Sequence, residues 1–171
     1  NTGLSILEMS HRSKEFVAIM EEARALVLEL SGLTGKGYQA LFLHGGASLH
    51  FYASALTLLE RKGAYIDTGT WSHKALTEAQ FVGTTSVVAS SRENGYRNIP
   101  TDFALPLDAD YLHITTNNTI YGTEYSHYPE VEVPLVADMS SDIFSKEMPM
   151  DKFALIYAGA QKNIGAAGVT L

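Results

Sequence analysis

The sequence predicts an α/β fold built on a mostly parallel sheet flanked by helices. Short apolar runs have the length of buried strands, and they lie at residues 40–43, 64–67, 86–89, 111–115, 135–138 and 153–157. Between several of these runs the apolar residues recur at the spacing of a helix, as in 13–31 and 71–81. Strands that alternate with helices are typical of βαβ units, whose strands run parallel.

The first half of the chain carries the clearest helix signals. Residues 13–31 form an amphipathic pattern, with Ser13 as the predicted N-cap and Gly32 just past the end. The run at 40–43 is predicted to be a buried strand, and the small residues 45–48 lead from it into a second helix. Further along, a helix over 71–81 separates two strands.

The second half contains more loop. Residues 92–107 lack a clear period, with a turn signal at Asn94-Gly95 and breaks at Pro100 and Pro106. A polar segment at 117–119 is predicted to be a turn. The last residues, 168–171, could form a short strand, but we favour the interpretation that the chain is a piece of a longer protein.

Composition limits the possible functions. The 171 residues suggest one domain, and 46% hydrophobic with 18% charged residues argues against disorder. A net charge of −7 argues against a broad nucleic-acid surface. Because there is no cysteine, disulfides, thiolate nucleophiles and cysteine-ligated zinc are excluded, and we assign no metal site. Neither a signal peptide nor an apolar run of about 18 residues is visible, so we expect a cytoplasmic protein.

The segment Gly45-Gly46-Ala47-Ser48 follows a predicted strand and opens a predicted helix. Small residues at that position let the backbone N–H groups of a helix N-terminus approach an anion closely. The alternative is a tight turn that needs glycine for backbone reasons alone. The segment matches neither of the two common glycine-rich nucleotide fingerprints.

Asp138 ends an apolar strand, where a carboxylate needs a partner. It could hold a metal, orient a histidine, pair with a cationic heterocycle, or simply cap the following turn. Lys162 follows the next strand and is flanked by small residues. We expect its amine to be desolvated or engaged by an anion, which would free it as a nucleophile, although a solvated loop lysine is the simpler alternative.

Together these residues suit pyridoxal 5'-phosphate. Asp138 and Lys162 lie 24 residues apart, at the ends of neighbouring predicted strands. The cofactor needs an amine for covalent attachment, a carboxylate beside its pyridine nitrogen and a phosphate cradle. Trp71, the only tryptophan, could stack on the ring, or could pack in an ordinary core.

Seven segments carry a resemblance to a known family. They are MSHRSKEF, FLHGGASLHF, DTGTWSHKALTEA, ASSRENGYRNIP, ITTNNTIYGTEY, VADMSSDIFS and YAGAQKNIGAAGVT. The chain resembles the phosphoserine aminotransferases, which are class V members of the fold type I, aspartate-aminotransferase-like enzymes that use pyridoxal phosphate. The resemblance covers about the first half of a family member, so residues 1–171 are expected to be part of the large cofactor-binding domain. The family's N-terminal segment and small C-terminal domain are expected to lie outside this chain.

The resemblance implies a role for each matching residue on the cofactor. Lys162 would be the covalent attachment point and proton shuttle, and Asp138 would pair with the pyridine nitrogen. Trp71 would stack on the ring, and Thr119 would contact the 3-oxygen side. The phosphate cradle would comprise three further residues, Ala47, Ser48 and Gln161.

The resemblance also implies the substrates. His11 and Arg12 match the family's substrate-anion segment, and a guanidinium suits a carboxylate or phosphate, although a surface salt bridge is the alternative for Arg12. Some family members have Gly-Arg in place of Ala47-Ser48, and a glutamine is common in place of His50. The implied reaction transfers an amino group between glutamate and 3-phosphohydroxypyruvate, giving phosphoserine for serine biosynthesis.

The family's homodimer shares residues between its two active sites, and the family's α-carboxylate arginine lies in the absent half. We therefore expect the chain alone to be inactive. Two alternatives remain open: another fold type I enzyme, such as an alanine–glyoxylate-type aminotransferase or a cysteine desulfurase, and a non-enzymatic α/β binding module. The last predicts that Lys162 and Asp138 lie on opposite sides of the sheet.

Overall fold

The computed structural model describes residues 3–171, which divide into two compact units. Unit 1 comprises the described residues up to 41 together with Glu147–Asp151, and unit 2 comprises Phe42–Lys146 and Lys152–Leu171. The length of the chain suggests a single domain, whereas its contacts cluster into these two units. The sheet and both helices that pack on it belong to unit 2.

Unit 1 is built on the helix α1 (Lys14–Leu30), preceded by the short 3-10 helix η1 (Ile6–Glu8). The Ser13 hydroxyl accepts a hydrogen bond from the Phe16 N–H, and Gly32 follows the helix with a φ of +64°. The N-cap and the terminating glycine predicted from the sequence are therefore confirmed. No residue of α1 is buried. A salt bridge of 2.7 Å between Lys36 and Asp151 joins the two segments of the unit.

Unit 2 contains a five-stranded parallel sheet in the order β3-β2-β4-β7-β8. Its strands are β2 (Lys62–Asp67), β3 (Thr85–Ser90), β4 (Ala109–Thr115), β7 (Leu135–Asp138) and β8 (Leu155–Tyr157). Because all five run in the same direction, their carboxyl ends meet at one edge. At that edge Thr115 pairs with Asp138, and Asp138 pairs with Tyr157. The predicted fold class is confirmed.

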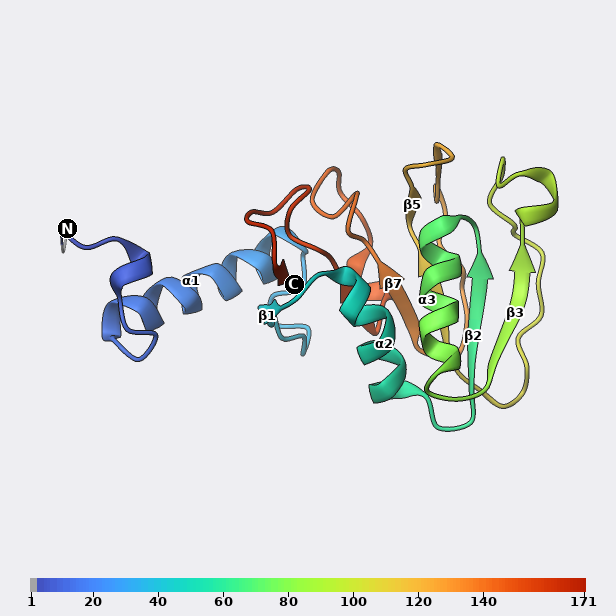
Figure 1. Ribbon diagram of the computed structural model, residues 1–171, viewed down its shortest axis with the longest axis horizontal. Helices are drawn as coiled ribbons and strands as arrows, with labels where there is room; N and C mark the ends of the chain where they lie inside the picture. Colours follow the sequence, from blue (N-terminus) through green and yellow to red (C-terminus); the bar gives the residue numbers. More distant parts are fainter. Residues whose placement is uncertain (1–2) are drawn as a thin grey trace. The chain divides into compact units, whose positions relative to one another are not determined.

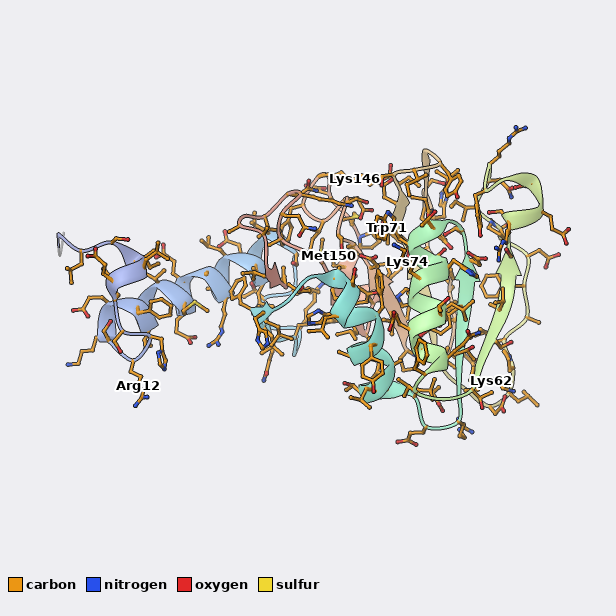
Figure 2. All side chains as sticks on the ribbon, in the orientation of Figure 1. Arg12, Lys62, Trp71, Lys74, Lys146 and Met150 are labelled. Atoms are coloured by element: carbon orange, nitrogen blue, oxygen red, sulfur yellow. The ribbon has the colours of Figure 1, made fainter. Side chains whose placement is uncertain are left out.

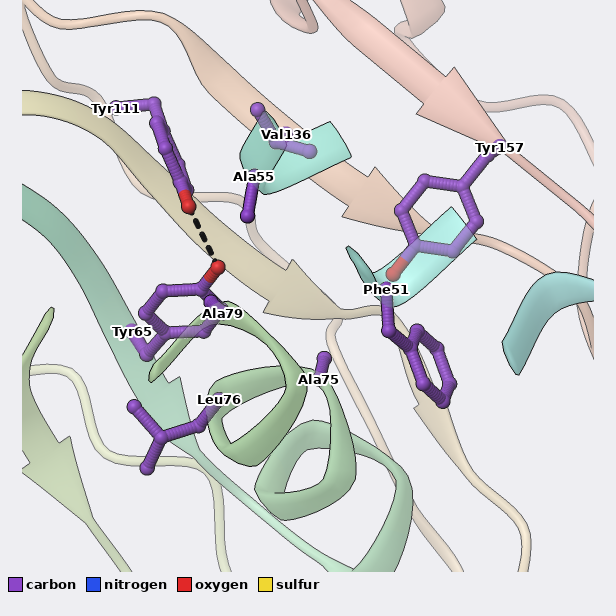
Figure 3. Packing of buried hydrophobic residues seen from close by; sticks show 9 residues of the cluster. All are labelled: Phe51, Ala55, Tyr65, Ala75, Leu76, Ala79, Tyr111, Val136 and Tyr157. Atoms are coloured by element: carbon purple, nitrogen blue, oxygen red, sulfur yellow. Dashed lines mark hydrogen bonds between the residues drawn. The ribbon is translucent and has the colours of Figure 1, made fainter. Parts of the chain in front are cut away.

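Two helices, α2 (Ala47–Leu58) and α3 (Thr70–Gln80), pack side by side on one face of this sheet, as Figure 1 shows. The core lies between helices and sheet and is formed by Phe51, Ala55, Tyr65, Ala75, Leu76, Ala79, Tyr111, Val136 and Tyr157 (Figure 3). Within it the hydroxyls of Tyr65 and Tyr111 are hydrogen-bonded at 2.6 Å. Alternate residues on the same strands, such as Ile66, Leu112 and Ile114, are also fully buried. Burial on both faces explains why these strands read as continuous apolar runs.

Two short antiparallel ladders complete unit 2. One pairs β1 (Leu43–His44) with β9 (Val169–Thr170), and the Gly45 N–H beside it donates to the Gly168 carbonyl at 2.9 Å. The other pairs β5 (Asn117–Asn118) with β6 (Thr123–Glu124). A 3-10 turn of unit 2 is η2 (Arg92–Asn94), whereas the first two residues of η3 (Met150–Lys152) belong to unit 1. Within residues 3–171, no helix combines the length and the apolar character needed to cross a bilayer.

Two local predictions are wrong. The run at 40–43 is not a buried strand, because the ladder begins only at Leu43, where the side chain is 45% exposed. This strand has a single short partner and lies outside the five-stranded sheet, so its apolar residues are not enclosed. The polar segment at 117–119 is not wholly a turn either, since Asn117 and Asn118 form one arm of a hairpin. Thr119 lies in the turn itself.

Candidate active site

A cavity of about 200 Å³ opens at the carboxyl edge of the sheet in unit 2. Its walls come from the first turn of α2, the start of α3, the region where β4 and β7 end, and the loop after β8. The lining residues are Gly46, Ala47, Ser48, Phe51, Trp71, Thr115, Asn117, Asp138, Ser140, Ser141, Gln161 and Lys162. In open parallel sheets, ligands bind in the crevice outside the carboxyl ends of the strands.

Asp138 is the last residue of β7 and is only 5% exposed. Its Oδ1 accepts hydrogen bonds from the Ser140 N–H at 3.0 Å and from the Ser140 hydroxyl at 2.6 Å. Burial raises the pKa of this carboxyl, while the two Ser140 hydrogen bonds and the charge of Lys162 act in the opposite direction. Asp138 thus caps the turn after β7 and also lines the cavity, so the two interpretations of this residue are compatible.

Lys162 lines the same cavity from the loop after β8. Its Nζ lies 6.0 Å from the centroid of the Trp71 ring. The residue is exposed, so the predicted desolvation is wrong and the alternative of a solvated loop lysine agrees with the structure, while engagement by an anion stays a prediction. Its small neighbours Gly165, Ala166 and Ala167 are exposed as well and do not cover it. The binding-module alternative predicted Lys162 and Asp138 on opposite sides of the sheet, and their shared cavity contradicts it.

Trp71 is the second residue of α3, and its position follows from how that helix begins. The Ser72 hydroxyl accepts hydrogen bonds from the N–H groups of Thr68 and Gly69, at 2.8 and 2.9 Å. A Cβ at Gly69 would lie 2.9 Å from the Asn118 Oδ1, so any larger residue there would require the Asn118 side chain to shift.

The indole of Trp71 is half-buried and faces two cations. The Nζ of Lys74 lies 4.7 Å from its ring centroid, and Figure 2 shows both residues at the N-terminal end of α3. The indole face therefore attracts positive charge in addition to offering apolar surface. Its Nε1–H is buried and has no hydrogen-bond partner among residues 3–171.

The N-terminus of α2 forms another wall of the cavity. Gly46 is the N-cap and supplies no side-chain hydrogen bond. The N–H groups of Ala47 and Ser48 donate to no group in the part of the chain that the structure describes. Gly45 has a φ of +97°, in the left-handed region that favours glycine. Free N–H groups at the positive end of a helix dipole favour an anion at this wall.

Three of the predicted site residues are not among those that line this cavity. Thr119 is exposed in the turn between β5 and β6 and is not among the residues that line the cavity. His11 and Arg12 belong to unit 1, where both are exposed and their side chains contact each other at 3.4 Å. Arg12 forms no ion pair with any residue from 3 to 171, so the surface salt bridge considered for it is not observed.

The sequence analysis missed several residues that line the cavity, notably Thr115, Asn117, Ser140 and Ser141. Thr115 pairs with Asp138 across the sheet, and its Oγ1 is buried without a partner among the described residues. A signal for it was available, because a strand at 111–115 in a parallel sheet ends at the same edge as Asp138. Ser140 could have been found as the residue two positions after a buried carboxylate, where a cap is common.

Comparison with known proteins shows the family of the chain. The sequence model of the family Aminotransferase class-V matches residues 2–171. The phosphoserine aminotransferase of Flavobacterium psychrophilum is 60% identical over 100% of this chain and 49% of its own length. A solved structure of the phosphoserine aminotransferase from Bacillus circulans subsp. alkalophilus has a TM-score of 0.95 and 44% identity, covering 99% of this chain and 48% of that one.

A further solved structure is the PLP-bound phosphoserine aminotransferase from Trichomonas vaginalis, with a TM-score of 0.90 and 33% identity. It covers 99% of this chain and 49% of its own chain. The chain therefore spans about half the length of the relatives it matches. The family match runs through every element that lines the cavity, from the first turn of α2 to the loop that carries Lys162. The chain belongs to the class-V aminotransferase family.

Proposed function

We propose that the cavity of unit 2 binds pyridoxal 5'-phosphate, and that the full-length protein carrying this chain is a phosphoserine aminotransferase. The observation that carries the proposal is the shared lining of one cavity by Lys162, Asp138 and Trp71, next to an uncapped helix N-terminus. An amine, a buried carboxylate, an aromatic face and an anion cradle are the four groups that this cofactor requires. The names of the similar proteins support the same assignment.

The residues present fit the cofactor. The free N–H groups of Ala47 and Ser48 would hold its phosphate, with the Gln161 side chain beside them. The buried carboxylate of Asp138 would face its ring nitrogen, and the indole of Trp71 would cover the ring. When bound, the cofactor supplies an electron sink for the bond that breaks at the α-carbon of an amino acid.

This chain's own residues would carry out the proton transfers. The Lys162 amine would attach the resting cofactor and, once released by an incoming amino acid, would take the proton from its α-carbon. Asp138 would hold a proton on the ring nitrogen by presenting negative charge to it from a buried position. Trp71 would fix the plane of the ring, and therefore the face on which Lys162 acts.

The substrates we propose are glutamate and 3-phosphohydroxypyruvate, with phosphoserine and 2-oxoglutarate as products. Both substrates are anionic, so the site must supply cationic side chains. His11 and Arg12 are the candidates from this chain, because Arg12 is exposed and its guanidinium is not engaged by an acid among residues 3–171. Further cationic residues would come from the portion of the relatives' length that this chain does not span. Thr119 would contact the ring's 3-oxygen side from the turn between β5 and β6.

We also propose that the full-length protein is a cytoplasmic homodimer. The absence of cysteine is in keeping with a reducing compartment. The exposure of Lys162 is in keeping with a site that a second chain, or the rest of this one, helps to enclose. Size-exclusion chromatography with light scattering would give the mass of the assembly, and a monomer that retains full activity would contradict the homodimer.

The decisive experiment is cofactor attachment in the full-length protein. Wild-type protein reconstituted with PLP is expected to show a near-visible absorbance band that survives dialysis, and Lys162→Ala is expected to abolish that band. Lys152→Ala is the matched control, because Lys152 is a surface lysine paired with Glu130 in the same unit. A wild-type protein without the band, or a Lys162→Ala variant that keeps it, would contradict the proposal.

The substrate is tested separately by amino-group transfer to 2-oxoglutarate. Phosphoserine is expected to be the preferred donor over alanine and cysteine. Preference for alanine would instead favour an alanine–glyoxylate-type aminotransferase, and release of sulfide from cysteine would favour a desulfurase. Either result would leave the cofactor site intact and overturn only the substrate assignment.

A further inference from the structure

The proposed function depends on Asp138 and on the loop that carries Lys162, and the hydroxyl of Ser140 contacts both. Ser140 is only 8% exposed and also lines the cavity. Its Oγ donates to the Asp138 Oδ1 at 2.6 Å and accepts from the Gly159 N–H at 3.0 Å. One side-chain atom therefore joins the carboxylate at the end of β7 to the backbone that leads from β8 to Lys162.

The geometry of Asp138 shows what this contact does. Both hydrogen bonds that its carboxylate accepts from described residues, from the Ser140 N–H and hydroxyl, fall on Oδ1. No group among residues 3–171 donates to Oδ2. A carboxylate held through one oxygen by two donors cannot rotate freely about its χ2 bond. The other oxygen is left with its acceptor capacity available at the wall of the cavity.

The contact with Gly159 extends this order to the lysine loop. The parallel ladder between β7 and β8 continues one residue past the strands, because the Met139 N–H donates to the Tyr157 carbonyl at 3.0 Å. Beyond that point, the next hydrogen bond between the two segments is the one that the Gly159 N–H donates to the Ser140 hydroxyl. Gly159 is three residues before Lys162, so the hydroxyl fixes the backbone at the point where the lysine loop begins.

We propose that Ser140 is a positioning residue that aims Asp138 at the ring nitrogen of bound pyridoxal phosphate and holds it in register with the loop that carries Lys162. The inference rests on the proposed function, since it assigns Asp138 to that nitrogen. Ser140 itself acts through Asp138. Its hydrogen bonds also favour the charged form of the carboxylate, against the effect of burial on its pKa.

The test measures the dissociation constant of PLP from the full-length apoprotein by fluorescence titration. Ser140→Ala is expected to weaken PLP binding about tenfold, because a hydrogen bond to a charged group is lost beside the ring nitrogen. Ser140→Thr keeps the hydroxyl and is expected to restore affinity to within about twofold of wild type. Ser145→Ala is the matched control, since the Ser145 hydroxyl lies in the same loop but donates to the Asp142 carbonyl.

A double-mutant cycle separates positioning from a merely structural role. If Ser140 acts through Asp138, Ser140→Ala is expected to change PLP affinity less than about twofold in an Asp138→Asn background. Circular dichroism checks that each variant is folded. An unchanged affinity in Ser140→Ala, or the same tenfold loss in the Asp138→Asn background, would overturn the inference while leaving the proposed function in place. Failure of the wild-type protein to bind PLP would instead overturn the proposed function, and the inference with it.

Discussion

Asp142 is a buried carboxylate with half of its hydrogen-bonding capacity unused. It is 2% exposed, its Oδ1 accepts from the Thr116 hydroxyl at 2.6 Å, and its Oδ2 is buried without a partner among residues 3–171. Burial raises its pKa to about 6, with repulsion from Glu124 and Asp138 adding to the effect and Lys146 and the Thr116 hydrogen bond opposing it. The folded protein therefore resists ionising a group that ionises readily in the unfolded chain.

The sign and size of the effect follow from linkage. In the unfolded chain an aspartate titrates near its ordinary value of about 3.9, so between that pH and about 6 the folded protein binds more protons than the unfolded one. Stability is therefore lost as pH rises through this window. A difference of about two pKa units corresponds to about 2–3 kcal/mol, at 1.36 kcal/mol per unit. Above about pH 7 the free energy of unfolding has fallen by this whole amount.

The assay is urea unfolding of the full-length protein at pH 5 and pH 8. Asp142→Asn keeps an oxygen for Thr116 and removes the charge. Because about half of the loss has already occurred at pH 5, the stability of this variant relative to wild type is expected to rise by about 1.4 kcal/mol between pH 5 and pH 8. The control is Asp102→Asn, which makes the same chemical change at an exposed aspartate. If Asp142→Asn destabilises the protein equally at both pH values, the carboxylate is not buried in its charged form and the reasoning fails.

Three further predictions concern the core of unit 2, each read as the free energy of unfolding in urea. Tyr65→Phe and Tyr111→Phe should each cost about 1–3 kcal/mol by leaving one hydroxyl unpaired, whereas the double variant should cost clearly less than their sum; strict additivity would mean the hydroxyls do not interact. Gly63→Ala should cost about 1–3 kcal/mol, because its new methyl group would lie 2.7 Å from the Tyr111 hydroxyl, and a neutral result would show that Tyr111 moves aside. Leu76→Ala should cost about 2–5 kcal/mol, and a loss below 1 kcal/mol would mean that α3 collapses into the space.

Signals that act within a few residues were read correctly from the sequence. The cap at Ser13, the glycine after α1 and the bounds of β7 depend on local chemistry, and the structure agrees with all three. The apolar run at 40–43 misled, because composition does not reveal whether a strand joins the central sheet or a short ladder at its side. Burial of a strand is decided by its partners, which lie far away in the chain.

The residues of the candidate site also differ in whether a local sequence signal reveals them. Asp138 was found because a carboxylate after an apolar strand is conspicuous, and Lys162 because small residues surround it. Thr115 and Ser140 were missed because neither type is unusual at a strand end, and their value arises from register with Asp138. The sequence left open whether Lys162 is desolvated or is a solvated loop lysine, because small flanking residues permit close packing without supplying the atoms that would pack.

The ladder between β1 and β9 has a mechanical consequence for the cavity. It joins the start of the 45–48 turn to the end of the lysine loop, through the Gly45–Gly168 hydrogen bond and the contact of the Thr170 hydroxyl with the Gly45 carbonyl. Hydrogen bonds therefore hold together two segments that are separated by more than a hundred residues along the chain. An anion bound at the first turn of α2 would therefore also restrict the motion of the loop that carries Lys162. Part of the entropy cost of ordering that loop would then already be met when a second ligand contacts it.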